Sequence, residues 1–150
     1  MKLFKRNPDF LIGSPDDPYM RRWWVMPRNK VFNIYLHHIR RDDDDRALHD
    51  HPWPSISFVL KGQLTEVLEN RTRVLRRFIP YPRKSTTAHR LVVNSVRGTD
   101  DNPKNVWTLF ITGPRIRKWG FHCPKGWVFW KDFCAVDNKG LVGRGCGEHE

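Results

Sequence analysis

The sequence predicts an all-β domain of the sandwich, jelly-roll or small-barrel type. About nine short runs of β-type residues are separated by proline and glycine, and no stretch of eleven or more residues has helical periodicity. With 150 residues, 39% hydrophobic residues and seven tryptophans spread along the chain, a single domain can bury a sizeable core. We expect an irregular lead-in over residues 1–20, the barrel over 21–137 and a flexible, glycine-rich tail over 138–150.

Each expected strand is a short run rich in β-branched and aromatic residues that ends at a proline, a glycine or a polar turn. Gly62 supplies one such turn, and Pro80 with Pro82 should break the chain again, because proline cannot donate to a ladder. The four aspartates at 42–45 and the polar residues 94–105 are interpreted as solvated loops. In chain order the predicted strands cover residues 21–26, 31–39, 55–60, 63–69, 72–79, 86–93, 106–112, 118–122 and 127–133.

The chain is strongly basic, with a formal net charge of +11 at neutral pH. Such a charge indicates an acidic partner, which is nucleic acid, an anionic surface or a small anionic molecule, or else an arginine-rich exposed face. The stretch 71–84 holds six positive residues and no acid, and its aromatic residues would suit stacking on nucleic acid. An arginine that turned inward, for which Arg76 is the candidate, would anchor a substrate carboxylate or phosphate.

The three cysteines, Cys123, Cys134 and Cys146, have an odd count and wide spacings that suit neither a disulfide framework nor a zinc knuckle. Reduced thiols are therefore expected, as in the cytoplasm. The first residues lack the apolar run of a signal peptide, and no span approaches the length of a membrane helix. These features predict a cytoplasmic protein without a membrane partner.

Two histidines, His49 and His51, stand at the head of an apolar run that ends at Gly62. On a strand, residues i and i+2 point to the same side, so both imidazoles can meet at one point inside a barrel. His89 is the best candidate for a third ligand, because it interrupts an apolar row on a later predicted strand. The three side chains predict a site for a divalent metal.

This pattern resembles the cupin superfamily over about residues 49–94. The first cupin motif has an HxH pair, a glutamate four residues later and a glycine seven further on, and the two histidines and Gly62 keep that spacing. The second motif is matched more loosely by Pro82, His89 and Asn94. The segment TGPRIRKWGFHCPKGWV is also similar to small uncharacterised cupin proteins of bacteria and their phages. The resemblance implies a double-stranded β-helix, a jelly-roll barrel with the metal inside, and it allows a homodimer through the outer sheet.

Ser55 stands where many cupins have the glutamate ligand, so the resemblance implies three histidines without a carboxylate. This set is similar to the thiol dioxygenases and related three-histidine cupin oxygenases. Three neutral imidazoles leave a divalent ion its full positive charge, which favours an anionic, chelating substrate. Iron(II) is the first expectation for the ion. Zinc, manganese and nickel are alternatives, because three histidines and a water also describe a catalytic zinc site.

Other residues are candidates for the same pocket. Glu66 shares a row with two leucines and is interpreted as a fourth ligand, a general acid or base, or the partner of an arginine. His38 would reach the cavity in a catalytic role or lie at the surface, and Trp53 is expected to wall the site. The remaining predicted pocket residues are Ser55, Ser57, Tyr35 and Trp107, the last two being core residues in the alternative interpretation.

Three functions follow from these features. The first is an iron(II)-dependent dioxygenase, an oxidoreductase that acts on a small anionic substrate at the three histidines. The second is a barrel without catalytic activity that binds an anionic ligand such as a nucleotide, a sugar phosphate or nucleic acid. The third is a sugar-nucleotide epimerase or isomerase without metal, in which a histidine acts as general base.

Overall fold

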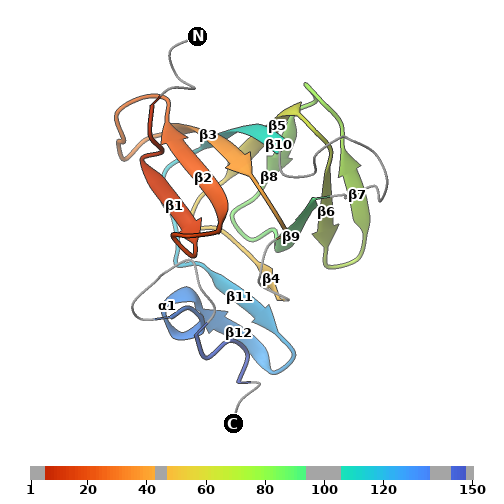
Figure 1. The fold of residues 1–150 in the computed structure, drawn as a ribbon. Coiled ribbons are helices and arrows are strands. Elements are labelled where there is room, and N and C mark those ends of the chain that lie inside the picture. Colours follow the sequence, from red (N-terminus) through yellow and green to blue (C-terminus); the bar gives the residue numbers. More distant parts are fainter. Residues whose placement is uncertain (1–5, 43–46, 94–105, 136–142, 148–150) are drawn as a thin grey trace.

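The structure, a computed structural model, describes residues 6–42, 47–93, 106–135 and 143–147, and this part of the chain is almost entirely β-structure (Figure 1). Strands pair antiparallel in two six-stranded sheets. The first sheet contains, in spatial order, β1 (Phe10–Gly13), β2 (Pro18–Trp24), β3 (Asn33–Ile39), β10 (Val106–Thr112), β5 (Ser55–Lys61) and β8 (Tyr81–Arg83). The second contains β12 (Gly126–Phe129), β11 (Gly120–Cys123), β4 (Leu48–His49), β9 (His89–Val93), β6 (Leu64–Leu68) and β7 (Thr72–Leu75).

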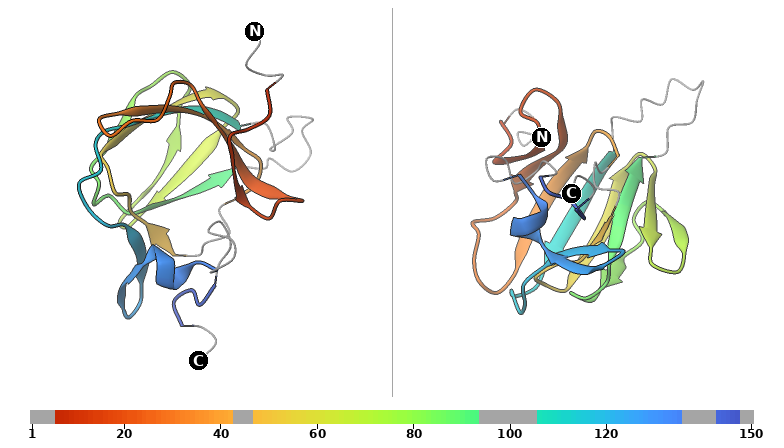
Figure 2. Two further views of the ribbon diagram at one scale, coloured as in Figure 1. Left: turned by 90° about the vertical axis from the view of Figure 1, so that its left-hand side faces the viewer. Right: turned by 90° about the horizontal axis from the view of Figure 1, so that it is seen from below.

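The two sheets face each other as the walls of a barrel (Figure 2), and the predicted all-β jelly-roll fold is confirmed. Gly62, at a φ of 82°, turns the chain from β5 in one sheet to β6 in the other, and glycine adopts this left-handed backbone without strain. Inward side chains from both sheets form one apolar core, in which Ile39, Val59 and Leu64 are almost fully buried. Four of the core residues, Tyr19, Met20, Leu64 and Leu75, also line the cavity described below.

Three strands differ from the sequence prediction. β1 lies inside the lead-in that was expected to be irregular, and it pairs with β2 along Phe10–Ile12. The strand β4 was not predicted, because two residues are too short for a sequence pattern and only their pairing with β11 and β9 defines the strand. β8 contains Pro82, which was expected to break the chain. Because β8 is the edge of its sheet, the missing N–H of the proline removes no ladder bond that the edge requires.

The C-terminal part of the barrel is closed by β11, β12 and one helical turn, α1 (Trp130–Phe133), where a strand over 127–133 was expected. A disulfide joins Cys123 to Cys146 at a Cα–Cα distance of 5.5 Å, which corrects the expectation of three reduced thiols. The backbone N–H groups of Gly143 and Gly145 donate to the carbonyl of Phe133, so this described piece of the tail is held against α1. The cytoplasmic location, which relied on reduced thiols, stays a prediction.

Several expectations fall outside the described residues. They concern the aspartates at 43–45, the loop at 94–105 with Asn94, and the tail at 138–142 and 148–150. Among the helices of the described chain, none has the length and hydropathy needed to cross a membrane.

Candidate metal centre

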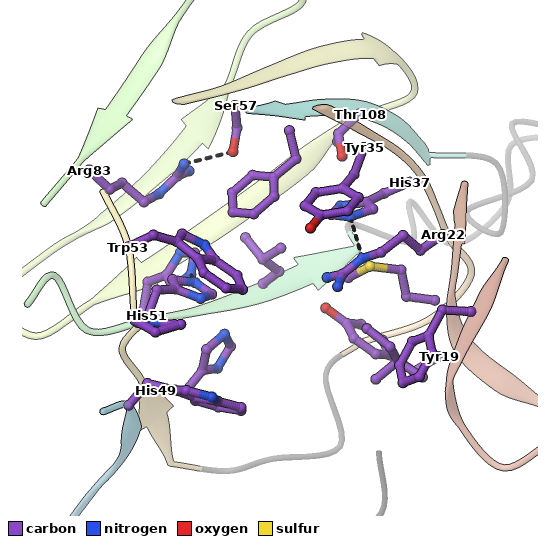
Figure 3. Close-up of a pocket in the computed structure, with 18 of the residues that line it drawn as sticks. Tyr19, Arg22, Tyr35, His37, His49, His51, Trp53, Ser57, Arg83 and Thr108 are labelled. Atoms are coloured by element: carbon purple, nitrogen blue, oxygen red, sulfur yellow. Dashed lines mark hydrogen bonds between the residues drawn. The ribbon is translucent and has the colours of Figure 1, made fainter. Parts of the chain in front are cut away.

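The three predicted ligands meet at one end of the barrel. His49 on β4 lies directly opposite His89 on β9 in the ladder, so their side chains point to the same side of the sheet. His51 follows two residues later and points the same way, with its backbone N–H bonded to the carbonyl of Ser85 at 3.1 Å. The Nε2 atoms of His51 and His89 are 2.8 Å apart, and one nitrogen from each of the three rings lies within 4.8 Å of the others. Figure 3 shows His49 and His51 along the same wall of the pocket.

Asp50 separates the two histidines and points away from them. Its carboxylate is 1% exposed and accepts hydrogen bonds from the N–H of Gly120 at 2.9 Å and from the indole of Trp127 at 2.9 Å. Arg117 lies 3.0 Å from one of its oxygens and His122 lies 3.1 Å from the other. Asp50 therefore fastens the short strand β4 to the β11–β12 hairpin, which fixes the position of both neighbouring imidazoles.

Glu66 lies behind His89 and is completely buried. One oxygen is 2.5 Å from Nδ1 of His89, and the carboxylate also accepts from Nε of Arg73 at 2.7 Å and from Nε of Arg83. Burial alone would raise the pKa of Glu66, but the hydrogen bond from His89 and the charge of Arg83 hold the pKa well below its usual range. The ionised carboxylate accepts a hydrogen bond from Nδ1–H of His89, which leaves Nε2 as the unprotonated nitrogen that faces the other histidines.

The histidines have the protonation state that a metal requires. Burial lowers the pKa of His49 and of His89 to about 4, and burial with the neighbouring imidazoles lowers the pKa of His51 well below its usual range. All three rings are thus neutral near pH 7. Two nitrogens that are each about 2.1 Å from one ion are separated by roughly 3 Å, which the His51–His89 pair already matches. The donor set fits a divalent ion.

The histidines line the end of a cavity of about 380 Å³. Of the predicted pocket residues, Trp53, Ser57 and Tyr35 also line this cavity. Trp53 stacks on His51 with ring centroids 6.5 Å apart, and Ser57 accepts a hydrogen bond from Nη1 of Arg83 at 2.7 Å. The residues that sequence analysis did not place here include Arg22, Arg83, His37, Tyr19, Thr108 and Phe110.

Four candidate residues lie elsewhere than predicted. His38 and Trp107 are on the outer face of their sheet, where their rings stack at 4.5 Å, because β3 turns Tyr35 and His37 inward instead. Arg76 is exposed, and the inward arginine of the basic stretch is Arg83. Ser55 is buried beside the cavity without lining it. Glu66 does not line the cavity either, and its ion pairs with Arg73 and Arg83 give it one of the roles expected for it, the partner of an arginine.

Comparison with known proteins supports the fold. No family model matches the chain, and no curated protein matches it. Solved structures of similar fold include the DMSP lyase DddQ from Ruegeria pomeroyi, with a TM-score of 0.55 and 13% identity over 77% of this chain and 58% of that chain. A putative mannose-6-phosphate isomerase from Ralstonia eutropha has a TM-score of 0.53 and 16% identity over 71% of this chain and 92% of that chain. An RmlC-like cupin from Shewanella frigidimarina has a TM-score of 0.51 and 14% identity over 69% and 82%.

At these identities the likeness shows the fold alone. The chain has the cupin fold, a double-stranded β-helix. Inside this fold, the protein brings together three histidines that could hold a divalent metal.

Proposed function

We propose that the protein is a mononuclear metal-binding cupin, an iron(II)-dependent dioxygenase that acts on a small anionic substrate. The observation that carries the proposal is the convergence of His49, His51 and His89, all neutral, at the end of a cavity large enough for a small molecule. No carboxylate of the described residues shares this point with them. Bound there, iron(II) would supply the binding and activation of dioxygen next to the substrate.

The chain itself contributes orientation and exclusion of water. Glu66 holds His89 in one tautomer, and Asp50 holds the segment that carries the other two ligands, His49 at the end of β4 and His51 just after it. Aromatic rings of Trp53, Trp119 and Phe121 surround the imidazoles and restrict access of water to that end of the cavity. Because the three ligands are neutral, an anionic substrate group is attracted to the ion without competition from a protein carboxylate.

Metal content tests the proposal directly. The protein would be purified without added metal and analysed for iron, zinc, manganese and nickel, together with His51→Ala, His89→Ala and the control His38→Gln. His38 lies on the outer face of its sheet and outside the group, so its variant keeps all three ligands and the contacts of Asp50. We expect close to one iron per chain in the wild type and the control, and strongly reduced iron in both ligand variants. Equal, negligible metal in all four proteins would overturn the proposal.

The outcome also separates the alternatives. A metal-free protein that binds anions in this cavity would be the binding barrel without chemistry. Stoichiometric zinc in place of iron would keep the metal site and remove the oxygenase assignment. Neither alternative has a structural observation of its own, because both use the cavity described above.

A further inference from the structure

Arg22 brings a charged group into the cavity, on the side away from His49 and His51. It is an inward residue of β2, paired with His37 of β3, whereas its neighbour Arg21 pairs with His38 on the outer face. In Figure 3 the guanidinium of Arg22 points into the pocket, beside His37 and Tyr35 and across from His49 and His51. The cavity therefore has two functional ends.

Part of the Arg22 guanidinium is held by neutral groups. Its Nε donates to Nε2 of His37 at 2.9 Å, and its central carbon lies 4.8 Å from the centroid of the Tyr35 ring. The side chain is thereby fixed with one edge occupied, which leaves the edge formed by the two terminal nitrogens for another partner. Among the described residues, no carboxylate lies within ion-pair distance of Arg22.

Arg83, the other inward arginine, shows what a satisfied buried guanidinium looks like in this barrel. It pairs with Glu66, donates to Ser57 at 2.7 Å and to the carbonyl of Tyr81 at 3.1 Å. Arg22 has no comparable anion, and burial lowers its pKa, which reflects the cost of keeping its charge away from water. Arg22 is half-buried and faces the cavity, so an anionic ligand bound there would supply the counter-ion that the described residues do not.

The surroundings select the kind of anion. Burial and the charge of Arg22 lower the pKa of His37 well below its usual range, so His37 is neutral and accepts from Arg22. Arg28 also lines this end of the cavity, so its charge adds to that of Arg22, but the free two-pronged edge belongs to Arg22 and matches the two oxygens of a carboxylate. Aromatic rings of Tyr19, Tyr35 and Phe110 line the space next to it and suit a flat or apolar ligand body.

We propose that Arg22 anchors the carboxylate of a small organic acid whose other end faces the three histidines. The second half of this statement rests on the proposed function, and the first half does not, because the carboxylate site exists without metal. The substrate class is then an organic acid with a metal-binding group at a distance from its carboxylate.

Binding to metal-free protein tests the anchor. Benzoate would be titrated into the chelator-treated protein by calorimetry, with benzamide as the neutral analogue and inorganic phosphate as the competing anion. We expect saturable binding of benzoate and at least about tenfold weaker binding of benzamide, as the loss of a charge-assisted pair predicts. Absence of benzoate binding, or Arg22-dependent phosphate binding that is tighter than benzoate binding, would overturn the proposal.

Variants assign the binding to Arg22. Arg22→Gln keeps a donor for His37 and removes the charge, so benzoate affinity should fall by about tenfold or more. Arg22→Lys keeps the charge without the two-pronged edge and should bind benzoate with intermediate affinity. Arg21→Gln removes the same charge from the outer face of the same strand and should leave the affinity within about twofold. Equal losses in Arg22→Gln and Arg21→Gln would mean a non-specific charge effect and would overturn the assignment.

Thermal unfolding distinguishes a loss of benzoate binding from a loss of folding in the Arg22→Gln variant. Because Arg22 has no carboxylate partner to lose, Arg22→Gln should unfold without ligand at a temperature no lower than the wild type. A marked loss of stability would show that Arg22 is structural and would overturn the proposal. Benzoate binding in a protein that takes up no metal would support the anchor while removing the proposed function, and metal uptake without benzoate binding would do the reverse.

Discussion

Glu66→Gln is the substitution that should affect both stability and metal binding, although Glu66 does not reach the cavity. The side chain is fully buried between Arg73, Arg83 and His89, and glutamine has nearly the same shape without the charge. Its removal leaves Arg83, whose side chain is 1% exposed, without a counter-ion. Breaking one side of a buried ion pair costs about 3 to 5 kcal/mol, and we expect the free energy of unfolding to fall by that amount.

The same substitution removes the acceptor of the Nδ1 proton of His89. Loss of such an acceptor typically weakens a metal site by about 10- to 100-fold, because the ring is no longer held in one tautomer and orientation. Urea unfolding of metal-free protein would measure the first effect, and competition with a chromophoric chelator would measure the second. Glu69→Gln removes the same charge from an exposed position beside the β6–β7 turn and serves as the matched control.

The reasoning would be refuted by a folded Glu66→Gln protein that resembles the control in both assays. A stability within about 1 kcal/mol of the wild type would mean that the two arginines find other partners or water. Unchanged chelator competition would mean that His89 is positioned by packing alone.

Three further predictions concern other parts of the molecule. Between pH 7.5 and 5.5 the metal-free protein should lose several kcal/mol of stability, because four histidines have lowered pKa values in the folded state, namely His37, His49, His51 and His89. These histidines stay neutral in the folded protein, whereas in the unfolded chain they take up protons below about pH 6.5, at about 1.4 kcal/mol per proton and pH unit. Urea unfolding curves that coincide at all pH values in this range would contradict the prediction. Cys146→Ser opens a loop with a sequence separation of 23 and should cost about 3 kcal/mol of stability; a reductant should destabilise the wild type but not the variant, and equal responses would exclude the disulfide as the cause. Asp50→Ala leaves four polar partners without their acceptor and should lower both stability, by about 2 kcal/mol or more, and metal affinity; unchanged unfolding and chelator-competition curves would show that β4 does not depend on this anchor.

A strand was predicted well where its β-type residues end at a clear turn, as for residues 106–112, which match β10 residue by residue. The inward face of β3 was not predictable in the same way. From Tyr35 to Ile39 both of its rows are buried, because Leu36 on the outer row pairs in register with Trp23 and Leu109. Hydrophobic alternation therefore does not distinguish the two faces, and His38 was chosen where His37 lines the cavity.

The inward arginine of the basic stretch 71–84, Arg83, was missed for a different reason. Between Leu75 and Tyr81 the chain leaves one sheet and enters the other, and Phe78 has a left-handed backbone with φ of 62°. Alternation cannot be counted through such a segment, so Arg76 and Arg83 were indistinguishable from the sequence. Only the ladder of β8 with β5, which places Arg83 opposite Ser55, decides between them. The disulfide was likewise hidden, because an odd number of cysteines gives no pairing rule.

The position of the two carboxylates behind the histidines has a practical consequence. Asp50 and Glu66 are held by hydrogen bonds and ion pairs within the protein, so the imidazoles lie near one another without a bound ion. Such a site separates metal loading from folding, in contrast to small zinc domains that unfold when the metal is removed. The proposed metal should therefore be removable and replaceable without refolding of the protein, which makes exchange of one metal for another a direct test of which ion the three histidines prefer.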